Sequence, residues 1–346
     1  MPGPSVDVEP INLKDSKYGH CLRDFKIISL LGKGSFGSVY KVLSLHTRQT
    51  YVMKKISTLS TLKVSYQNAA VREVTLLKCL DNPHVVKLMT SFVEKDCLYI
   101  IMEYAQSGDI HSFITKQKDS KKRLKETELW SMLHELLLGI QHLHENNVIH
   151  RDLKPLNLFL NSKRCIKIGD LGVAKKIIDD NEDDKNYQIC DSKVGTPLFL
   201  APELVQNYKY DFKVDIWAIG VTMYYLTVLF PPFAGDNLNQ LSNNILNTSP
   251  KDLPKYYTNR YKSLILSFLS KNPSERPTAA EALEKVPDLI KTAYISQFRF
   301  NEVKDKEGSI SSRDSAKKLS ELPLTVIPIP MYKKSVKMTA ERLARP

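Results

Sequence analysis

The stretch His150-Arg-Asp-Leu-Lys-Pro-Leu-Asn157, followed downstream by Ile168-Gly-Asp-Leu-Gly172, carries the clearest chemical pattern in the sequence. Asn157 follows Asp152 by five positions and Asp170 follows it by eighteen. Phosphoryl transfer from a nucleotide needs a carboxylate beside the attacking hydroxyl and oxygen ligands for Mg²⁺ on the phosphates. Mg²⁺ takes a few hard oxygen ligands from a protein, which suits one Asn and one Asp. The pattern therefore predicts a phosphoryl-transfer site; the alternative is a surface loop with scattered charges.

Length and composition indicate a globular protein of one large or two small domains. The chain has 346 residues, of which 42% are hydrophobic and 25% charged, as in ordinary globular proteins. Its net charge of +12 would suit nucleic acid or a membrane surface. We favour a solvated basic face and a basic tail, because net charge bears on association and not on fold. We therefore expect neither a nucleic-acid partner nor a membrane partner.

Cysteine usage and the start of the chain predict the compartment. The five cysteines form no C-x-x-C pair, so we expect neither a zinc site nor a disulfide framework: Cys21, Cys79, Cys97, Cys165 and Cys190. The N-terminus lacks the basic-then-apolar layout of a signal peptide, and no run reaches about 18 apolar residues. We expect an intracellular, cytoplasmic protein that does not span a membrane.

A glycine-rich loop is predicted between the first two strands. After a loose lead-in at 1–24, the apolar residues of 25–31 indicate a strand, and 39–45 is β-rich again. Glycines let the backbone approach phosphate oxygens and donate N–H groups to them. A Rossmann fold would require a helix after this G-x-G-x-x-G, so strand–loop–strand is favoured. The candidate nucleotide-binding residues of this loop are Gly32, Lys33, Gly34, Ser35, Phe36, Gly37 and Val39.

A lysine and a glutamate further on are candidates for one ion pair. In a strand over 51–56, alternation places Val52 and Lys54 on the same face, toward a nucleotide. A helix over about 66–80 would carry Glu73, which follows Lys54 by 19 residues. A buried Lys–Glu pair would hold the ammonium toward the phosphates. The alternatives are a solvated lysine on a strand edge and an ordinary glutamate on a helix surface.

Two more strands are expected, at 85–88 and 97–102, before a turn-like joint at 103–108. Backbone groups of Glu103 and Ala105 could bind an adenine edge, with Met102 behind the pocket. The joint separates a β-rich region from a helical one. From Glu126 a long helix follows, whose apolar stripe we assign to the core.

The region from about Phe25 to Ile290 resembles a eukaryotic protein kinase and is most similar to the NIMA-related serine/threonine kinases. The resemblance rests on motifs in the expected order: Ser91-Phe-Val-Glu with Leu98-Tyr-Ile-Ile-Met-Glu-Tyr104, Gly108-Asp-Ile110, the HRDLKPLN and GDLG stretches, Pro155-Leu-Asn-Leu-Phe-Leu160 and Val194-Gly-Thr-Pro-Leu-Phe-Leu-Ala-Pro-Glu203. It implies an α+β, two-lobed fold, with a β-rich N-lobe at about 25–105 and a helical C-lobe at about 106–290. Residues 1–24 would be an extension, and 291–346 a basic tail without packed structure.

The resemblance also implies roles at the catalytic stretch. Asp152 would orient the substrate hydroxyl and accept its proton, and Lys154 would steady the transferring phosphoryl group. Asn157 and Asp170 would hold Mg²⁺. A lysine two residues after Asp152 is typical of serine/threonine kinases and argues against a tyrosine kinase.

On the nucleotide side, the resemblance implies that Lys54 contacts the α and β phosphates of ATP and that Glu73 braces Lys54. Val39, Val52 and Phe159 would sandwich the adenine. The expected activity is ATP- and Mg²⁺-dependent phosphorylation of Ser or Thr in protein substrates. The alternative is a pseudokinase scaffold, which binds nucleotide without transferring phosphate.

Regulation is expected between Asp170 and Glu203. Ser192 has the spacing of an activation-loop phosphorylation site, and its phosphate could pair with Arg151; an unmodified polar linker is the alternative. Thr196 would help to align the catalytic loop. An upstream activating kinase is an expected partner. No sustained heptad follows the kinase region, so we expect no coiled coil that would drive dimerisation, and the oligomeric state stays open. The family resemblance extends the cytoplasmic expectation to the cytoskeleton or cilium.

Three further residues are expected to support the fold. Leu171 replaces the usual phenylalanine of the metal-binding tripeptide and would pack beneath the helix that carries Glu73. Asp215 would fix the catalytic-loop backbone. Arg276 would form a structural ion pair with Glu203.

Overall fold

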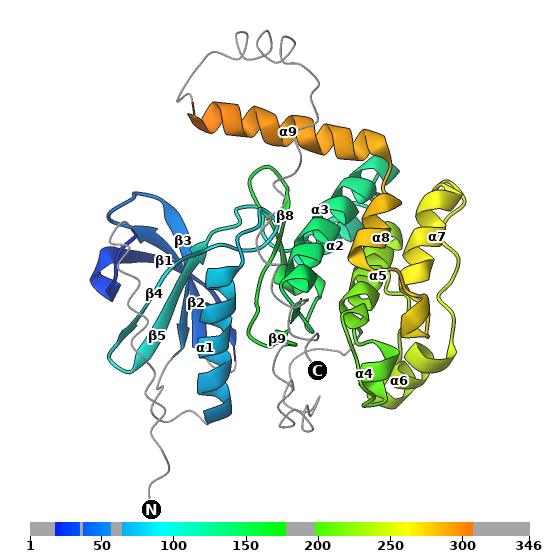
Figure 1. Cartoon of the computed structure of the whole chain (residues 1–346), viewed down its shortest axis with the longest axis horizontal. Helices are drawn as coiled ribbons and strands as arrows, with labels where there is room; N and C mark the ends of the chain where they lie inside the picture. The colour runs from blue at the N-terminus through cyan, green and yellow to red at the C-terminus, as the bar shows by residue number, and fades with distance from the viewer. Residues whose placement is uncertain (1–17, 35–36, 57–63, 178–197, 307–346) are drawn as a thin grey trace, which may run out of the picture. The chain divides into compact units, whose positions relative to one another are not determined.

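The computed structural model describes residues 18–34, 37–56, 64–177 and 198–306. The chain divides into two compact units, Met1–Lys291 and Thr292–Pro346, which are described separately. The first unit contains a five-stranded antiparallel sheet with one long helix, and then a largely helical part (Figure 1). This arrangement confirms the predicted α+β, two-lobed fold.

The N-lobe sheet has the strand order β1-β2-β3-β5-β4. The elements of the N-lobe are η1 (Leu22–Asp24), β1 (Phe25–Gly34), β2 (Gly37–Ser44), β3 (Thr50–Ile56), α1 (Val64–Cys79), β4 (Leu88–Glu94) and β5 (Cys97–Glu103). Central strand β3 pairs with both β2 and β5, so Lys54 lies opposite Val39 on one side and Ile100 on the other. The position of Lys54 is therefore fixed by two ladders of backbone hydrogen bonds.

Side chains of β3 alternate between two hydrophobic clusters, as the period of a strand requires. Val52 and Ile56 pack with Leu77 of α1, whereas Tyr51 and Met53 belong to a separate cluster on the opposite face. The predicted facing of β3 is thereby confirmed. Lys54 shares its face with Val52 and Ile56, toward α1.

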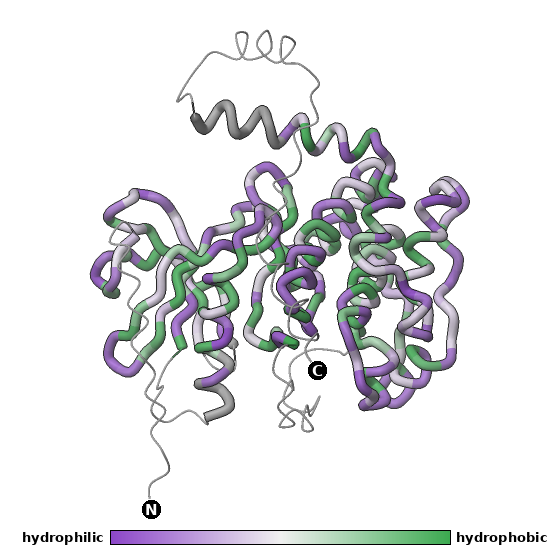
Figure 2. Tube along the Cα trace, in the orientation of Figure 1, coloured by the Kyte–Doolittle hydropathy of each residue, from purple (hydrophilic) through white to green (hydrophobic). Residues whose placement is uncertain are grey.

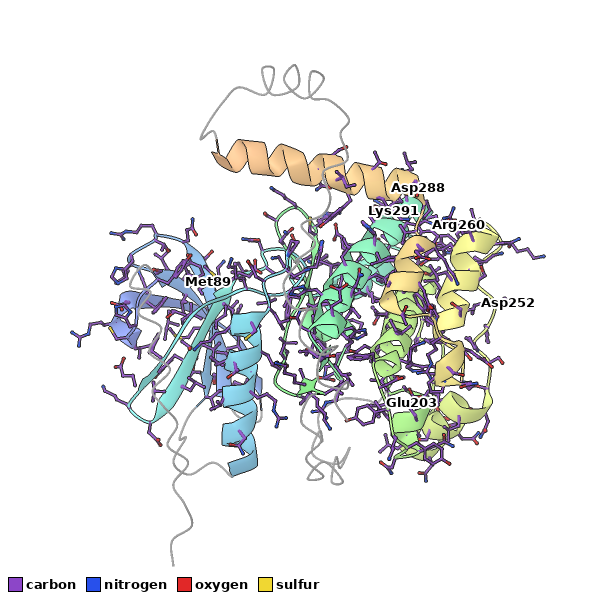
Figure 3. The ribbon with its side chains drawn as sticks, in the orientation of Figure 1. Met89, Glu203, Asp252, Arg260, Asp288 and Lys291 are labelled. Carbon is purple, nitrogen blue, oxygen red and sulfur yellow. The ribbon has the colours of Figure 1, made fainter. Side chains whose placement is uncertain are left out.

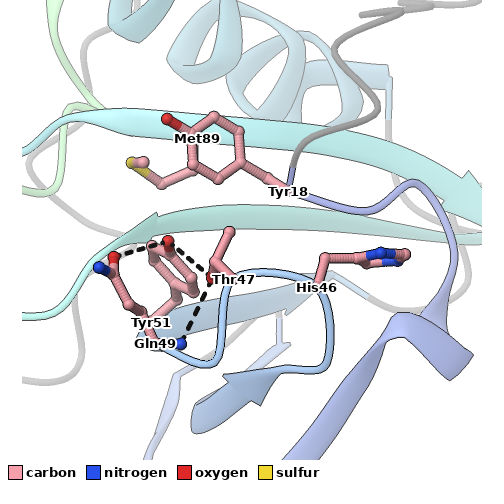
Figure 4. A pocket seen from close by; sticks show the side chains of 6 residues that line it. All are labelled: Tyr18, His46, Thr47, Gln49, Tyr51 and Met89. Atoms are coloured by element: carbon pink, nitrogen blue, oxygen red, sulfur yellow. Dashed lines mark hydrogen bonds between the residues drawn. The ribbon is translucent and has the colours of Figure 1, made fainter.

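The opposite face of the sheet bears a hollow of about 390 Å³ (Figure 4). Met89, labelled on β4 in Figure 3, lines it together with Tyr18, His46, Thr47, Gln49 and Tyr51. The Tyr51 hydroxyl lies 3.1 Å from Thr47 Oγ1 and donates to Gln49 Oε1 at 3.2 Å. Because Tyr51 faces away from Lys54, this hollow is separate from the predicted nucleotide site.

The expected strand at 85–88 is wrong, because β4 begins only at Leu88. Val85 instead forms an isolated parallel bridge with Ile168, and the Val86 N–H donates to the Ile168 carbonyl at 2.8 Å. The backbone of this β-branched pair is therefore engaged by a distant segment of the chain. Tertiary pairing overrides the local β propensity here.

The C-lobe is built around α3 and α5. Its elements are α2 (Ile110–Asp119), α3 (Glu126–Glu145), β6 (Val148–Ile149), η3 (Pro155–Asn157), β7 (Leu158–Leu160), β8 (Ile166–Ile168), β9 (Lys175–Lys176), α4 (Pro202–Val205), α5 (Lys213–Val228), α6 (Leu238–Asn247), α7 (Asn259–Phe268), η6 (Pro273–Glu275) and α8 (Ala279–Glu284). The apolar stripe of α3 is buried, which confirms its assignment to the core. Hydropathy along the chain shows hydrophobic stretches in both strands and helices (Figure 2).

A last helix, α9 (Asp288–Lys306), corrects the expectation that 291–346 lacks structure throughout. Pro287 precedes the helix, Asp288 lies in its first turn, and no Gly or Pro occurs before Gly308. Proline at a helix start and an acid in the first turn both favour helix formation. Among the described helices, none combines the length and the apolar character that crossing a membrane requires.

Candidate active site

Lys54 and Glu73 form the ion pair that their spacing predicts. The Lys54 Nζ lies 2.9 Å from Glu73 Oε1 and 2.8 Å from Oε2. Glu73 lies on α1 and is only 2% exposed, so its carboxylate is held by the helix inside the lobe. The same ammonium also donates to Asp170 Oδ1 at 3.2 Å. Three segments distant in sequence therefore meet at one nitrogen.

This three-residue cluster of Lys54, Glu73 and Asp170 is closed on one side and open on the other. The side chain of Lys54 is 25% exposed and that of Asp170 is 48% exposed, against 3% for Glu73. Burial alone would lower the pKa of Lys54, but the Glu73 and Asp170 carboxylates outweigh it and raise that pKa above its ordinary value. The ammonium therefore stays protonated next to the open side.

Asp170 is held in an unusual backbone conformation. Its φ is 57°, in the left-handed region, where aspartate is tolerated better than most non-glycine residues. Burial alone would raise the pKa of its carboxyl, but the Lys54 ammonium is the main influence that brings this pKa below its ordinary value. A Cβ at Gly172 would lie 3.3 Å from Asp170 Oδ1 and 3.5 Å from Glu73 Oε2. Glycine at 172 thus relieves a tight contact with the Asp170 carboxylate, whereas the distance to Glu73 is an ordinary van der Waals contact.

Asp152 lies in a second charged cluster, on the candidate catalytic loop formed by residues 150–157. The Lys154 Nζ donates to its two carboxylate oxygens at 2.9 and 2.8 Å. The Asn157 Nδ2 donates to the Asp152 carbonyl at 2.8 Å and to its Oδ2 at 3.0 Å. The structure therefore brings together the three loop residues that the sequence analysis selected.

Asn157 and Asp170 fit the requirements of a Mg²⁺ site. The Gly169 N–H donates to the Asn157 carbonyl at 2.9 Å, so the two residues lie on adjoining segments. Because Asp152 engages the amide nitrogen of Asn157, its amide oxygen is the atom left for a cation. One carboxylate and one amide oxygen are hard ligands of the kind that leave Mg²⁺ most of its positions for water and phosphate.

Asp215 fixes the backbone of the catalytic loop, as expected. Its carboxylate accepts the His150 N–H at 2.9 Å and the Arg151 N–H at 3.0 Å. Arg151 has a φ of 68°, a strained conformation for a bulky residue, so these hydrogen bonds stabilise a backbone that would otherwise relax. His144 Nε2 lies 2.9 Å from Asp215 Oδ2 and orients the carboxylate. His144 was not predicted, because nothing local in the sequence connects it with Asp215, 71 positions later.

The Arg151 side chain is part of the same support. Its Nε donates to the Val173 carbonyl at 2.7 Å, and its Nη1 donates to the Tyr210 hydroxyl at 3.0 Å. Tyr210 was also missed, because nothing local in the sequence connects it with a residue 59 positions earlier.

Apolar residues predicted for the adenine site lie around one hydrophobic cluster. Met102 belongs to it, and Val52 and Phe159 pack against it. A Cβ at Gly169 would lie 2.8 Å from Phe159 Cε2 and 3.1 Å from Val86 Cγ2. Gly169 therefore adjoins the predicted adenine wall and keeps space there, a role that the sequence analysis did not consider.

At the joint that follows β5, one of the backbone groups predicted to bind the adenine edge is already used inside the protein. The Glu103 N–H already donates to the Lys87 carbonyl at 3.0 Å. The Glu103 carboxylate accepts the Lys87 N–H at 2.8 Å and pairs with Lys167 Nζ at 2.7 Å. Of the two predicted residues, Glu103 can thus contribute its carbonyl, and Ala105 follows β5 by two positions.

The glycine-rich loop is a β-hairpin in which Gly34 pairs with Gly37. A Cβ at Gly37 would lie 1.9 Å from the Lys55 carbonyl oxygen, so glycine is required for the approach of β2 to β3. At Gly32 a Cβ would meet nothing within 4 Å, and Lys33 is exposed. Ser35 and Phe36 lie outside the described residues, as do Ser192 and Thr196.

Leu171 and Arg276 occupy the structural positions that were predicted for them. Leu171 is fully buried in the cluster that contains Leu77 of α1. Arg276 donates to Glu203, labelled on α4 in Figure 3, from Nη1 at 2.7 Å and from Nη2 at 2.9 Å.

Comparisons with known proteins agree with this geometry. Residues 25–286 match the protein kinase domain family. The chain is 35% identical over 278 residues to the probable serine/threonine-protein kinase nek3 of Dictyostelium discoideum, with 79% of this chain and 24% of that protein covered. It is 34% identical over 264 residues to serine/threonine-protein kinase Nek3 of Oryza sativa subsp. japonica, with 76% and 43% covered. It is 31% identical over 297 residues to human Nek11, with 85% and 45% covered.

The chain thus spans less than half the length of these curated relatives. The family match nevertheless covers most of the chain, including both lobes and the charged clusters. The names of the relatives also agree with the resemblance to NIMA-related kinases that the sequence motifs carry. This chain belongs to the protein kinase family, and its similarity is to the NIMA-related serine/threonine kinases.

Proposed function

We propose that this chain is an active serine/threonine protein kinase that transfers the γ-phosphate of ATP to hydroxyl groups of proteins. The observation that supports this most is the contact of one ammonium, that of Lys54, with both Glu73 and Asp170. It joins the N-lobe helix to the candidate metal ligand and leaves one side open to solvent. The kinase domain proposed to carry this activity is 25–290.

In the proposed reaction, the Asp152 carboxylate orients the acceptor hydroxyl and takes its proton. Lys154, whose ammonium lies on that carboxylate, places positive charge where the phosphoryl group would pass. Asn157 and Asp170 would hold Mg²⁺, which when bound supplies positive charge against the phosphate oxygens. Catalysis of this kind depends chiefly on positioning and charge neutralisation.

Lys54 is proposed to contact the α and β phosphates, with Glu73 holding its ammonium in place. Val39, Val52 and Phe159 are proposed to enclose the adenine, with Met102 behind it. The nearly complete burial of Glu73 supports its role as a fixed brace rather than a ligand.

Phosphorylation at Ser192 is proposed to regulate the activity. A phosphate there would carry about −2 charge and could join the Arg151 guanidinium, which is already oriented by Val173 and Tyr210. Phosphosite mapping of active protein tests this. Active protein without phosphate at Ser192 or at neighbouring Ser and Thr residues would contradict the proposal.

The experiment that tests the main proposal is transfer of γ-phosphate from ATP to a generic protein substrate, with the Asp170→Ala variant in parallel. We expect transfer by the unaltered chain and none by the variant. Nucleotide binding without transfer, even after treatment with cell extract, would instead favour the pseudokinase scaffold.

A further inference from the structure

The connection between α2 and α3 carries a dense basic surface. Residues 116–125, named here the basic connector, contain one acid, Asp119, and six basic residues: Lys116, Lys118, Lys121, Lys122, Arg123 and Lys125. All six are exposed except Lys118, which is half-buried. Within the part of the chain that the structure describes, none of the six forms an ion pair with Asp or Glu. Their positive charge is therefore not neutralised by the protein itself.

Aromatic rings hold two of these cations. The Lys118 Nζ lies 4.8 Å from the ring centroid of Phe230 and donates to the Tyr225 hydroxyl at 3.3 Å. The Arg123 guanidinium lies 5.6 Å from the ring centroid of Tyr256. Phe230 is 67% exposed and Tyr256 is 56% exposed. The face of an aromatic ring orients a cation but does not cancel its charge. Lys118 and Arg123 therefore keep their charge in fixed positions, next to the exposed rings of Phe230 and Tyr256.

Hydrogen bonds hold the connector in place on the C-lobe. The Tyr257 hydroxyl donates to the Leu124 carbonyl at 3.0 Å. The Glu126 carboxylate accepts the Thr258 N–H at 2.7 Å and its hydroxyl at 2.6 Å. Lys121 has a φ of 52° and makes the turn that presents the following basic residues. The backbone of the connector is thus preorganised, and so are the side chains of Lys118 and Arg123, which reduces the entropy lost on binding.

Acids nearby do not offset the charge of the connector. Asp252, labelled in Figure 3, lies in the segment before α7, where Lys251 and Lys255 are also exposed. Glu126 accepts the Thr258 N–H and the Trp130 indole N–H, the latter at 3.0 Å, and Glu128 accepts the Lys125 N–H at 2.8 Å. Together with Asp119 and Asp252 these are four acids, against six basic residues in the connector and the exposed Lys251 and Lys255. The net charge of the surface stays positive.

The basic connector lies one helix length from the catalytic loop. At its start, α2 adjoins β7 through a backbone bridge between Asp109 and Phe159, and α2 contacts η3. From Ile110 to Lys118 the helix advances about 12 Å, at about 1.5 Å per residue. An extended chain covers that distance with about four residues, at about 3.3 Å each. The path from Asp152 to the start of α2 adds to this, so a peptide at Asp152 would reach the connector more than about four residues from its acceptor hydroxyl.

We propose that the basic connector, with Phe230 and Tyr256, docks an acidic stretch of protein substrates located several residues from the phosphorylated Ser or Thr. This deepens the proposed kinase function and rests on it. Complementary charge would raise the rate of encounter and favour acidic substrates, and added salt would weaken the effect. Specificity would arise from docking and leave the chemistry at Asp152 unchanged.

The test compares two peptides with the same acceptor serine, one neutral and one with five glutamates about ten residues away. The test variant of the full chain carries Lys121→Gln, Lys122→Gln and Arg123→Gln. The control variant carries Lys95→Gln, Lys163→Gln and Arg164→Gln, which remove the same charge from exposed turns elsewhere. We expect an about tenfold lower KM for the acidic peptide, since several exposed charge pairs contribute modestly. The test variant should lose this preference at unchanged kcat, and the control variant should keep it.

A binding measurement separates failure of docking from failure of the kinase function. Fluorescence anisotropy of the labelled acidic peptide reports docking even if neither peptide is phosphorylated. Equal KM for both peptides with no binding, or a preference that the test variant keeps, would overturn the docking proposal. Tighter binding of a single-stranded oligonucleotide than of the acidic peptide would overturn it in favour of a nucleic-acid surface. The single variant Lys122→Glu gives the same comparison if the triple variant melts at a lower temperature than the unaltered chain.

Discussion

Of the buried carboxylates in this protein, one in each lobe pairs with a Lys or Arg cation, and the two pairs differ. In the N-lobe, Glu73 binds Lys54, and the same ammonium reaches Asp170 at 3.2 Å. In the C-lobe, Glu203 binds Arg276 through two hydrogen bonds. The side chain of Lys54 is 25% exposed, whereas that of Arg276 is not exposed at all.

The C-lobe pair is saturated. The Arg276 guanidinium also donates to the carbonyls of Lys213, Ser270 and Lys271 at 2.8 to 3.3 Å, and it lies 4.9 Å from the Trp217 ring centroid. No direction remains from which a ligand could approach it. The N-lobe cluster keeps an open side at Asp170, where phosphate and Mg²⁺ could bind. Two similar ion pairs thus differ in what they leave available. The donors of Arg276 are all used inside the protein, whereas the cluster around Lys54 keeps one side accessible to a ligand.

The largest effect should follow from removing charge on the open side. Asp170→Asn keeps the shape of the side chain but removes a metal-binding charge, and we expect phosphate transfer to fall at least about 10³-fold. The free energy of unfolding should change by less than about 1 kcal/mol, because this side chain is half exposed and exposed ion pairs contribute little. Kinase assays and urea unfolding measure the two quantities. If Asp170→Asn instead lost much stability and kept phosphate transfer, the open cluster would act as a structural ion pair, as we propose for Glu203 and Arg276.

The closed pair should behave in the opposite way. Arg276→Met leaves Glu203 buried without its cation, which should cost about 3–5 kcal/mol of unfolding free energy. Below the melting temperature, the phosphate transfer per folded molecule should stay within a few-fold of the unaltered chain. Urea unfolding and assays at low temperature test this. The double variant Glu203→Leu with Arg276→Met should recover part of the stability, because it leaves no unpaired charge. Equal stability of the single and double variants would contradict this account.

A third buried carboxylate, that of Glu135 on α3, extends the comparison to an acid without a cation. It accepts the Ile166 N–H at 2.7 Å, and within the described residues no cation pairs with it. Burial raises the pKa of Glu135 to about 7 from 4.5. The stability that this group contributes is therefore fully present below about pH 4.5 and is lost as the pH rises through about 7.

Glu135→Gln should remove this pH dependence while keeping an acceptor for the Ile166 N–H. We expect the variant to be more stable than the unaltered chain above pH 7, by up to about 3 kcal/mol, and equally stable near pH 4.5. Subtracting unfolding free energies at each pH cancels other titrating groups, such as His84, whose pKa burial lowers to about 4. A difference that stays constant with pH would contradict this prediction, because it would show that folding does not shift the pKa of Glu135.

The sequence predicted the open cluster because its parts have local signals. The alternation of side chains along β3 predicted the face on which Lys54 lies. The motif spacing identified Asp170 as a candidate metal ligand. Contacts between distant segments left no such signal. Val85 and Val86 were assigned to a strand, although their backbone binds β8. His144 and Tyr210 were missed, because their partners Asp215 and Arg151 lie 71 and 59 positions away in the sequence. The helix α9 was missed because its composition, rich in charge, suggested a tail.

The smallest effect is expected beneath the open cluster, at Leu171. This residue follows Asp170 and is buried with Leu77 and Ala174, so its contribution is volume and apolar contact rather than charge. Leu171→Met conserves both and should cost less than about 1.5 kcal/mol of unfolding free energy. Phosphate transfer should stay within about threefold of the unaltered chain, because the cluster above keeps all its hydrogen bonds. Leu171→Ala is the matched contrast: its cavity should cost about 2–5 kcal/mol. If Leu171→Met abolished phosphate transfer without loss of stability, the open cluster would depend on the shape of the side chain beneath it. Leu171 would then contribute to activity and not only to packing.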